Sequence, residues 1–448
     1  MMPRRPAWAG DLRTIFLVVA VLHVAVVLAV GHFRRPALYE NGAIARNLVE
    51  GRGFSGPLLP PPEHHAVGSA PAEPSPGEAP QADLQPTSVQ APGYPFLLAF
   101  SWRLLGDGPL AFAALSVLQA LLVSTVIWPV SWLAGRWYGE KAALWTAWIV
   151  GLYPAFLWAA TRLHHYPVAV FFHPWVVAGW IHLRARPSAR AGAAVGALTG
   201  VGALFQPMLL GIAGLLGAWS LGSTLRAGAR TAVRSLLIAA ALVALVILPW
   251  VVRGYHVHGR FVPLKDSFAK EFWIGNNPAA TGTDCAEGGA PLINRLVLEH
   301  PELKSAASET ELMDRMQALA LHEIRRDPGG FVSRSLRRVL WFWTLVPPRF
   351  LPATGMLRHV VVFYAAGWLA LAGLALATLR HRGRRPPEYA GVLAVYLFVY
   401  SVVYGLTFVA HSRFRGEAEY ILIPAAACTL AGWLRSRGPG EREAVPKT

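Results

Sequence analysis

The segment 34–57 follows directly on the first strongly apolar stretch of the chain and carries a carboxylate, Glu40, where a membrane-facing segment normally avoids an ionised group. A carboxylate held at the mouth of a membrane-embedded cavity can act as a general base toward a hydroxyl group, which typically contributes about 10²–10⁴-fold to a rate. The plainer alternative is an acidic residue that only stabilises the N-terminus of a helix. The choice depends on the elements that position Glu40.

Residues 40–50 are predicted to form a short amphipathic helix on the outer face of a membrane. On a helical wheel the apolar residues of this segment cover one face, while Glu40 and Glu50 fall on the other. Gly51 and Gly53 follow at once, and glycine tolerates the left-handed conformation found after a helix end. The segment therefore places Glu40 at the start of a helix, close to where the first apolar run emerges.

The composition indicates a membrane protein. Of the 448 residues, 54% are hydrophobic and only 15% are charged, whereas soluble proteins carry about a quarter charged residues. The mean hydropathy is +0.39. Several apolar runs, among them TIFLVVAVLHVAVVLAV and SLLIAAALVALVILPWVV, approach or reach the roughly 17–25 residues that a helix needs to cross a bilayer.

Arginine clusters between the apolar runs predict the topology. PRRP, LRARPSAR, LRAGARTAVR, LRHRGRR and LRSRGPGER follow the pattern of cytoplasmic loops, so the net charge of +16 reflects topology rather than nucleic-acid binding. Placing each cluster in the cytoplasm predicts an all-α polytopic membrane protein with about ten transmembrane helices. The predicted spans are residues 14–31, 109–134, 141–161, 166–183, 191–206, 208–222, 232–252, 357–380, 389–410 and 418–435.

Two further segments are predicted to be helices at the outer face rather than crossings. Residues 92–106 are too short to span, and a crossing there would invert the arginine pattern; residues 334–348 carry arginines at one end and aromatics at the other. The Pro-rich insertion 56–86 lacks apolar periodicity and is expected to stay unfolded.

Three regions are predicted from this topology. The N-terminal transmembrane region, 1–253, includes a first outer loop, 32–92. An outer segment with its interfacial helix covers 254–356, and the C-terminal transmembrane helices with a cytoplasmic tail cover 357–448.

Four stretches carry a resemblance to a known family. YENGAIARNLVEGRGFSGP, PTSVQAPGYPFLLAFSWRLLG, FWIGNNPAATG and HSRFRGEAEYILIPAA, in this order and placement between spans, resemble bacterial members of glycosyltransferase family 39. These are similar to the dolichyl-phosphate-mannose protein mannosyltransferases and share the GT-C membrane fold. The resemblance implies a bacterial inner-membrane enzyme that transfers a sugar, with inversion, from a polyprenyl-phosphate carrier to an acceptor at the outer, periplasmic face.

The resemblance also implies a role for Glu40. The family places an acidic residue in the first outer loop as the base, and Glu40 occupies the matching position, flanked by Tyr39 and Asn41 as candidate substrate contacts. Many members have an Asp or an Asp-Glu pair there. Because this chain has a single Glu, no metal site and no cofactor are predicted, and a divalent cation has no support in the sequence.

The leaving phosphate requires positive charge, which the resemblance assigns to an Arg-x-Arg element. Arg413 and Arg415 are predicted to point to the same side of an extended segment, and arginine offers a bidentate fork for phosphate oxygens. The alternative is contact with lipid headgroups.

Other polar residues are weaker substrate-binding candidates. His164 and His165 lie in an outer loop and have ordinary interfacial histidines as their alternative; Asn276 and Asn277 form either a lid over the site or simply a turn. Gln206 stands at the outer turn of a helical hairpin.

Two other functions stay open. A lipid or sugar transporter would need ionisable residues inside several spans, whereas here the spans are nearly free of them. A catalytically inactive GT-C relative that serves as an assembly subunit is compatible with the incomplete acidic motif. The acceptor, whether lipid, protein or glycan, is not specified by the sequence; the expected partners are the lipid-linked donor and membrane lipids.

Overall fold

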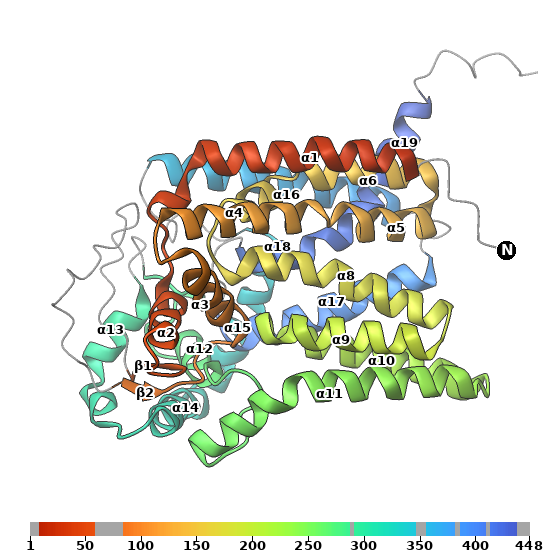
Figure 1. Ribbon diagram of the computed structural model, residues 1–448. Helices are drawn as coiled ribbons and strands as arrows, with labels where there is room; N and C mark the ends of the chain where they lie inside the picture. Colours follow the sequence, from red (N-terminus) through yellow and green to blue (C-terminus); the bar gives the residue numbers. More distant parts are fainter. Residues whose placement is uncertain are drawn as a thin grey trace, which may run out of the picture.

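The computed structural model describes residues 9–58, 84–286, 291–345, 355–380, 386–408 and 413–436. In these residues the chain is a bundle of long helices with shorter helices gathered at one end (Figure 1). The bundle helices are α1 (Ala9–Val30), α4 (Pro109–Ser124), α5 (Ile127–Tyr138), α6 (Glu140–Leu152), α7 (Pro154–Ala160), α8 (His165–Ala185), α9 (Ala189–Phe205), α10 (Met208–Arg226), α11 (Arg230–His258), α16 (Gly355–Arg380), α17 (Pro387–Leu406) and α19 (Ile423–Ser436).

One end of the bundle, on the left of Figure 1, is covered by short elements, and we call it the capped end. Its elements are η1 (His32–Arg34), α2 (Tyr39–Val49), β1 (Ser55–Pro57), β2 (Leu84–Pro86), α3 (Gly93–Leu105), α12 (Phe268–Gly275), α13 (Leu292–Glu299), η2 (Pro301–Ser305), α14 (Glu309–Arg326) and α15 (Pro328–Trp343). The predicted outer-face helices at 40–50, 92–106 and 334–348 thus correspond to α2, α3 and α15. Gly51 and Gly53, with φ of 79° and 71°, end α2 as predicted.

The turns between α8 and α9 and between α10 and α11 lie at the opposite end (Figure 1), which we call the arginine-rich end. In or beside these turns lie Arg184, Arg186, Arg190, Arg226 and Arg230. Clusters that the sequence separates by forty residues therefore meet at one end, as the topology predicted.

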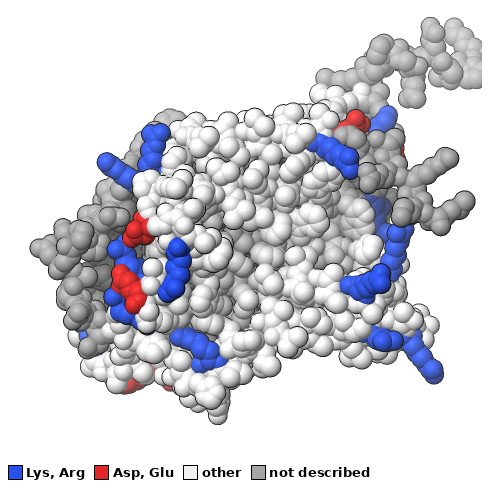
Figure 2. Space-filling model, in the orientation of Figure 1, with Lys and Arg blue, Asp and Glu red and all other residues white. Residues whose placement is uncertain are grey.

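On the face that Figure 2 shows, the surface between the two ends is uncharged. Figure 2 shows lysines, arginines and carboxylates at both ends of the visible face and a broad band without charge between them. Large apolar side chains are exposed along this band: Leu17 of α1 is 62% exposed, and Leu237 of α11 is 65% exposed. A soluble monomer rarely exposes so large a continuous apolar surface, so this band faces lipid and the chain is a membrane protein.

Within the described residues, six helices are long and apolar enough to cross a membrane, or seven if α6 and α7, bent by 49°, form one span. Nine of the ten predicted spans coincide with a helix or a helix pair, whereas 418–435 covers the end of α18 (Arg413–Glu419), η5 (Tyr420–Leu422) and α19. Helix α9 has only 17 residues and α19 only 14. Helix α8 carries several histidines and is buried over most of its length, so it needs no lipid-compatible surface. The total of ten crossings remains a prediction.

Close packing of α9 on α11 depends on glycine. A Cβ atom on Gly192 would lie 2.3 Å from the carbonyl oxygen of Ser235, and one on Gly196 would lie 2.4 Å from that of Ala239. Only a residue without a side chain permits this backbone approach, which is a common way of joining helices in lipid.

The prediction for the Pro-rich insertion 56–86 is wrong at its two ends. Strands β1 and β2 pair in antiparallel register, with Ser55 opposite Pro86 and Pro57 opposite Leu84. The ladder closes the loop at its base, so the backbone groups there find partners. Residues 59–83 of the insertion lie outside the described part of the chain.

Candidate functional site

Glu40 lies at the start of α2, and its nearest charged partner comes from a distant segment. The carboxylate Oε1 is 3.9 Å from Nζ of Lys270 on α12, and the two side chains are 30% and 20% exposed. Both groups are therefore partly shielded but still reachable from solvent. The N-terminus of α2 adds a favourable field for the carboxylate.

Tyr39 has an unusual backbone. Its φ of 50° makes it the one non-glycine residue with a positive φ in the described ranges. A left-handed conformation costs a residue with a Cβ atom roughly 1–2 kcal/mol, and such strain is common at functional sites. The ring of Tyr39 is 41% exposed, while the following Asn41 is buried at 2%. Of the three adjacent candidates, Asn41 is thus part of the interior.

The loop between α7 and α8 faces the start of α2. The ring of His164 lies edge-on to Tyr39 at 6.3 Å and stands 4.0 Å from the ring of His165. His164 also caps α8, because its Nδ1 accepts a hydrogen bond of 3.3 Å from the backbone N–H of Tyr166. The structure therefore brings Tyr39, His164 and His165 together, which the sequence alone did not show.

Arg162 in the same loop is a cation that the sequence analysis missed. Its guanidinium lies 4.3 Å from the centre of the Trp158 ring, a favourable cation–π contact. Its backbone carbonyl accepts a hydrogen bond of 2.6 Å from Gln119. Burial and then the charge of Arg162 lower the pKa of His32, so His32 stays neutral near Arg162.

The C-terminal end of α2 is fixed by a separate set of hydrogen bonds. Asn47 is buried, and its Nδ2 donates to the carbonyl oxygen of Ser55 at 2.8 Å. The Nε of Arg52 donates to Oδ1 of Asn47 at 2.9 Å. These bonds tie α2 to β1 and so hold the helix that carries Glu40.

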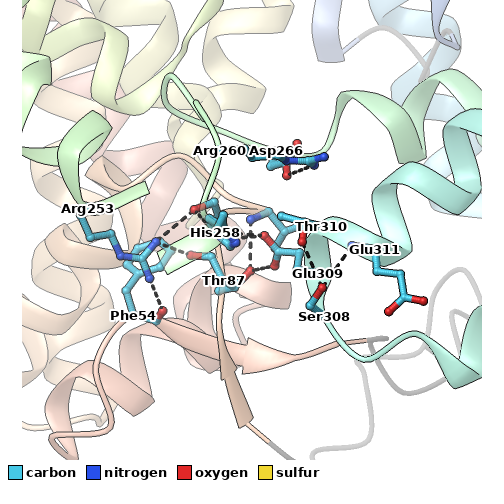
Figure 3. A network of polar contacts seen from close by, with 12 residues as sticks. Phe54, Thr87, Arg253, His258, Arg260, Asp266, Ser308, Glu309, Thr310 and Glu311 are labelled. Atoms are coloured by element: carbon cyan, nitrogen blue, oxygen red, sulfur yellow. Dashed lines mark hydrogen bonds and ion pairs between the residues drawn. The ribbon is translucent and has the colours of Figure 1, made fainter. Parts of the chain in front are cut away.

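A larger polar network joins the segments around β1 and β2 to the end of α11 and the start of α14 (Figure 3). Arg253 near the end of α11 donates through Nη1 to the carbonyl oxygen of Thr87 at 2.7 Å, and through Nη2 to that of Phe54 at 2.9 Å. Its guanidinium also lies 4.7 Å from the centre of the Trp250 ring. Arg253 therefore bonds to the residue before β1, Phe54, and to the residue after β2, Thr87.

Glu309, the first residue of α14, completes this network. Its side chain is 8% exposed; Thr87 donates its hydroxyl to Oε2, and the backbone N–H of Ser88 donates to Oε1 at 2.7 Å. His258 lies 3.8 Å from the same carboxylate through Nε2. Burial raises the pKa of Glu309 despite these hydrogen bonds.

The raised pKa predicts how stability depends on pH. A group whose pKa is raised in the folded state favours folding in its protonated form, so its contribution falls as pH rises through the folded pKa. We expect the wild type to lose stability relative to Glu309→Gln as pH is raised from about 4, because the amide does not ionise. Thermal unfolding of the wild type and of Glu309→Gln, measured at a series of pH values upward from about 4, gives the difference in stability between them. If that difference stays constant with pH, or changes in favour of the wild type, the raised pKa of Glu309 is contradicted.

Asn276 and Asn277 are buried and bind backbone groups, as the turn alternative predicts. The Nδ2 of Asn276 donates to the carbonyl oxygens of Phe272 and Leu406 at 2.8 and 2.7 Å. Asn277 donates to Trp273 at 2.9 Å. Both amides cap the end of α12, and that of Asn276 also fixes it to the end of α17, so these contacts favour the turn over the lid.

The extended conformation predicted around Arg413 and Arg415 is wrong. Residues Arg413–Glu419 form a helix, α18, so positions two apart do not point the same way. The side chain of Arg413 lies outside the described part of the chain. Its neighbour Arg415 is only 4% exposed and points inward.

The guanidinium of Arg415 is held in the interior through its Nε and Nη1 groups. Its Nε donates to Oε1 of Glu419 at 2.6 Å, and its Nη1 donates to the carbonyl oxygens of Phe342 and Thr344 at 2.8 and 2.5 Å. The Trp368 ring covers it at 4.2 Å. Arg415 joins α18 to the end of α15 and to α16, and no exposed fork remains for a phosphate.

Gln206 belongs to the same interior region. Its Nε2 donates to both carboxylate oxygens of Glu417 at 2.8 and 2.7 Å, and Glu417 is 1% exposed. His173 of α8 lies 3.6 Å from this carboxylate. The expectation that the spans are nearly free of ionisable groups is therefore wrong for the bundle interior, although it holds for the lipid-facing band.

Glu417 and Glu419 were missed because the sequence does not show that α18 turns inward. Tyr153 and Tyr364 donate their hydroxyls to Glu419, and Gly416 lets α18 approach Tyr166, whose hydroxyl would clash with any Cβ there. The sequence did offer one signal of buried carboxylates: Glu417 and Glu419 stand two positions apart, beside apolar segments that are rich in aromatic residues.

No metal site is evident: the described residues hold no group of three or more His, Cys, Asp or Glu side chains suited to a metal ion.

Comparison with known proteins tests the fold. The chain is similar to the oligosaccharyltransferase AglB from Archaeoglobus fulgidus in complex with an inhibitory peptide and a dolichol-phosphate, with 14% identity and a TM-score of 0.51 over 94% of this chain and 50% of that chain. It is also similar to the Archaeoglobus fulgidus oligosaccharyltransferase tethered with an acceptor peptide, with 13% identity and a TM-score of 0.53 over 96% of this chain and 51% of that one. The fold is GT-C-like.

This likeness concerns the fold alone. The GT-C-like chain spans about half the length of the AglB structures that it matches. ArnT from Cupriavidus metallidurans bound to undecaprenyl phosphate matches with 14% identity over 95% of this chain and 79% of that chain, at a TM-score of 0.43, which adds no weight. No protein-family model matches the chain, and no curated protein sequence matches it significantly.

Proposed function

We propose that this protein is an inverting membrane glycosyltransferase that moves a sugar from a polyprenyl-phosphate carrier to an acceptor at the outer face of a bacterial inner membrane. The observation that carries the proposal is the pair Glu40 and Lys270, a partly exposed carboxylate beside a partly exposed ammonium at the capped end of a GT-C-like bundle. The bound dolichol-phosphate named for AglB supports a lipid-phosphate donor. The family 39 resemblance remains the finer proposal.

In this mechanism Glu40 takes the proton of the acceptor hydroxyl. The acceptor oxygen then forms a bond to the anomeric carbon from the face opposite the phosphate, and the bond between that carbon and the phosphate oxygen breaks. The electron pair of that bond leaves with the phosphate, and Glu40 later releases the proton to water. A base must lie within about 2.6–3.2 Å of the proton donor, which the partly exposed carboxylate permits.

The leaving phosphate needs cations near Glu40. Because Arg415 is held by Glu419, we assign this part to Lys270, with Arg162 as a second cation from the loop that faces α2. A phosphate attracts an ammonium as a point charge and a guanidinium as a fork. Arg413 remains a candidate from the resemblance.

Lys270→Ala is expected to lower kcat/KM by about 10–100-fold, since a hydrogen bond to a charged group is worth about 1.5–3 kcal/mol. Lys270→Arg retains the charge and should recover part of this loss. Lys304→Ala is the matched control, because Lys304 is exposed in η2. Equal rates for Lys270→Ala and Lys304→Ala would remove Lys270 from the site.

The proposal itself is tested with purified protein in lipid vesicles and a labelled polyprenyl-phosphate sugar. We expect release of the sugar to added acceptors, together with formation of free polyprenyl phosphate. Movement of intact donor across the bilayer without cleavage would instead identify a transporter. Neither cleavage nor movement, with a range of donors and acceptors, would favour the assembly subunit.

A further inference from the structure

A polar pocket lies at the arginine-rich end, remote from the candidate site. Its volume is about 470 Å³, and it is formed where α5, α8 and α10 end and α17 begins. Arg136, Arg184 and Glu388 supply its charges, and Trp137 and Trp219 supply aromatic walls with two prolines. Its size matches that of pockets that bind small ligands.

The charge of Glu388 is already balanced within the pocket. Arg136 donates through Nε to Oε2 at 2.6 Å and through Nη2 to Oε1 at 3.1 Å. The indole N–H of Trp137 donates to the same carboxylate at 3.1 Å. These bonds fix the end of α5 to the start of α17 and leave the pocket with the positive charge of Arg184.

Arg184 is positioned but has no acidic partner among the residues that the structure describes. Its guanidinium lies 4.2 Å from the centre of the Trp219 ring, and its Nη1 donates to Oγ of Ser223 at 2.9 Å. An arginine has five N–H donors in a rigid fork, and Arg184 gives one of them to Ser223, so donors remain that a ligand in the pocket can use. The fork suits two oxygens of a phosphate group.

We infer that this pocket binds the phosphate of an anionic membrane lipid. The pocket is lined by residues of four bundle helices and lies at the arginine-rich end, where lipid headgroups are expected. Tryptophans favour this interface, and basic pockets between membrane helices bind acidic headgroups. The indole and proline walls provide the apolar surface that the glycerol region of a lipid needs, which a free phosphate would not use.

Native mass spectrometry of the full-length protein in detergent with phosphatidylglycerol or phosphatidylcholine tests this inference. We expect the wild type to retain phosphatidylglycerol preferentially, and Arg184→Gln to weaken that retention by about 10–100-fold. Arg184→Lys keeps the charge but lacks the guanidinium fork, so its retention of phosphatidylglycerol should lie between that of the wild type and that of Arg184→Gln. Arg190→Gln, an exposed arginine at the same end outside the pocket, should behave as wild type.

Three results would overturn the inference. The first is a wild type that retains both lipids equally, a comparison that does not depend on any variant folding. The second is equal retention by Arg184→Gln and Arg190→Gln. The third is displacement of phosphatidylglycerol by inorganic phosphate alone, which would identify a free phosphate site rather than a lipid site.

Discussion

Glu40→Gln is expected to lower turnover of a polyprenyl-phosphate sugar by about 10²–10⁴-fold, the usual contribution of a general base. The amide keeps the size of the side chain but cannot accept a proton at neutral pH. Because Glu40 is partly exposed and at a helix start, the variant should fold normally. Turnover and bound donor, measured on the same preparation, separate lost chemistry from lost binding.

Glu50→Gln is the matched control for this prediction. Glu50 lies at the other end of α2, pairs with Arg52 and has a side chain that is 40% exposed. A surface pair of this kind contributes about 0–1 kcal/mol to stability, so the rate should stay near that of the wild type. Equal activity of Glu40→Gln and Glu50→Gln would show that Glu40 is not the base.

Arg415→Met is expected to destabilise the protein by about 3–5 kcal/mol, the cost of leaving one member of a buried ion pair without its partner. Glu419, 1% exposed, would lose its cation, and the carbonyl oxygens of Phe342 and Thr344 would lose their donor. Unfolding in detergent, followed by heat or denaturant, gives the change in the free energy of unfolding.

The exposed pair Arg295–Glu299 offers a close control. It has the same i,i+4 spacing and the same N–O distance of 2.6 Å as Arg415–Glu419, but its side chains are 61% and 45% exposed. Arg295→Met should therefore cost no more than about 1 kcal/mol. The double variant Arg415→Met with Glu419→Gln should recover part of the loss, since no unpaired charge remains. Similar losses for Arg415→Met and Arg295→Met would contradict the buried role.

Local patterns predicted the helices well. The amphipathic period of residues 40–50 and the glycines at 51 and 53 predicted α2. The arginine clusters predicted which turns lie together at one end of the bundle. These features depend on neighbours in the chain or on a charge rule, so the sequence contains them directly. The Arg413–Glu419 helix was missed because a seven-residue segment has too little period to distinguish a helix from an extended run.

Partners across the fold were not predictable in the same way. Lys270 follows Glu40 by 230 positions, and nothing in either local segment indicates that α12 packs beside α2. The inward turn of α18 likewise depends on Gly416 meeting Tyr166 of another helix. A single sequence shows which residues can do chemistry, whereas long-range packing decides which of them meet.

The position of the donor phosphate tests the account most directly. An experimental structure of the protein with a polyprenyl phosphate or an uncleavable donor should place the phosphate at the capped end, within about 2.7–2.9 Å of a nitrogen of Lys270 or Arg162, with the carboxylate of Glu40 facing the same space. A phosphate found elsewhere on the bundle, with Glu40 directed to bulk solvent, would contradict it.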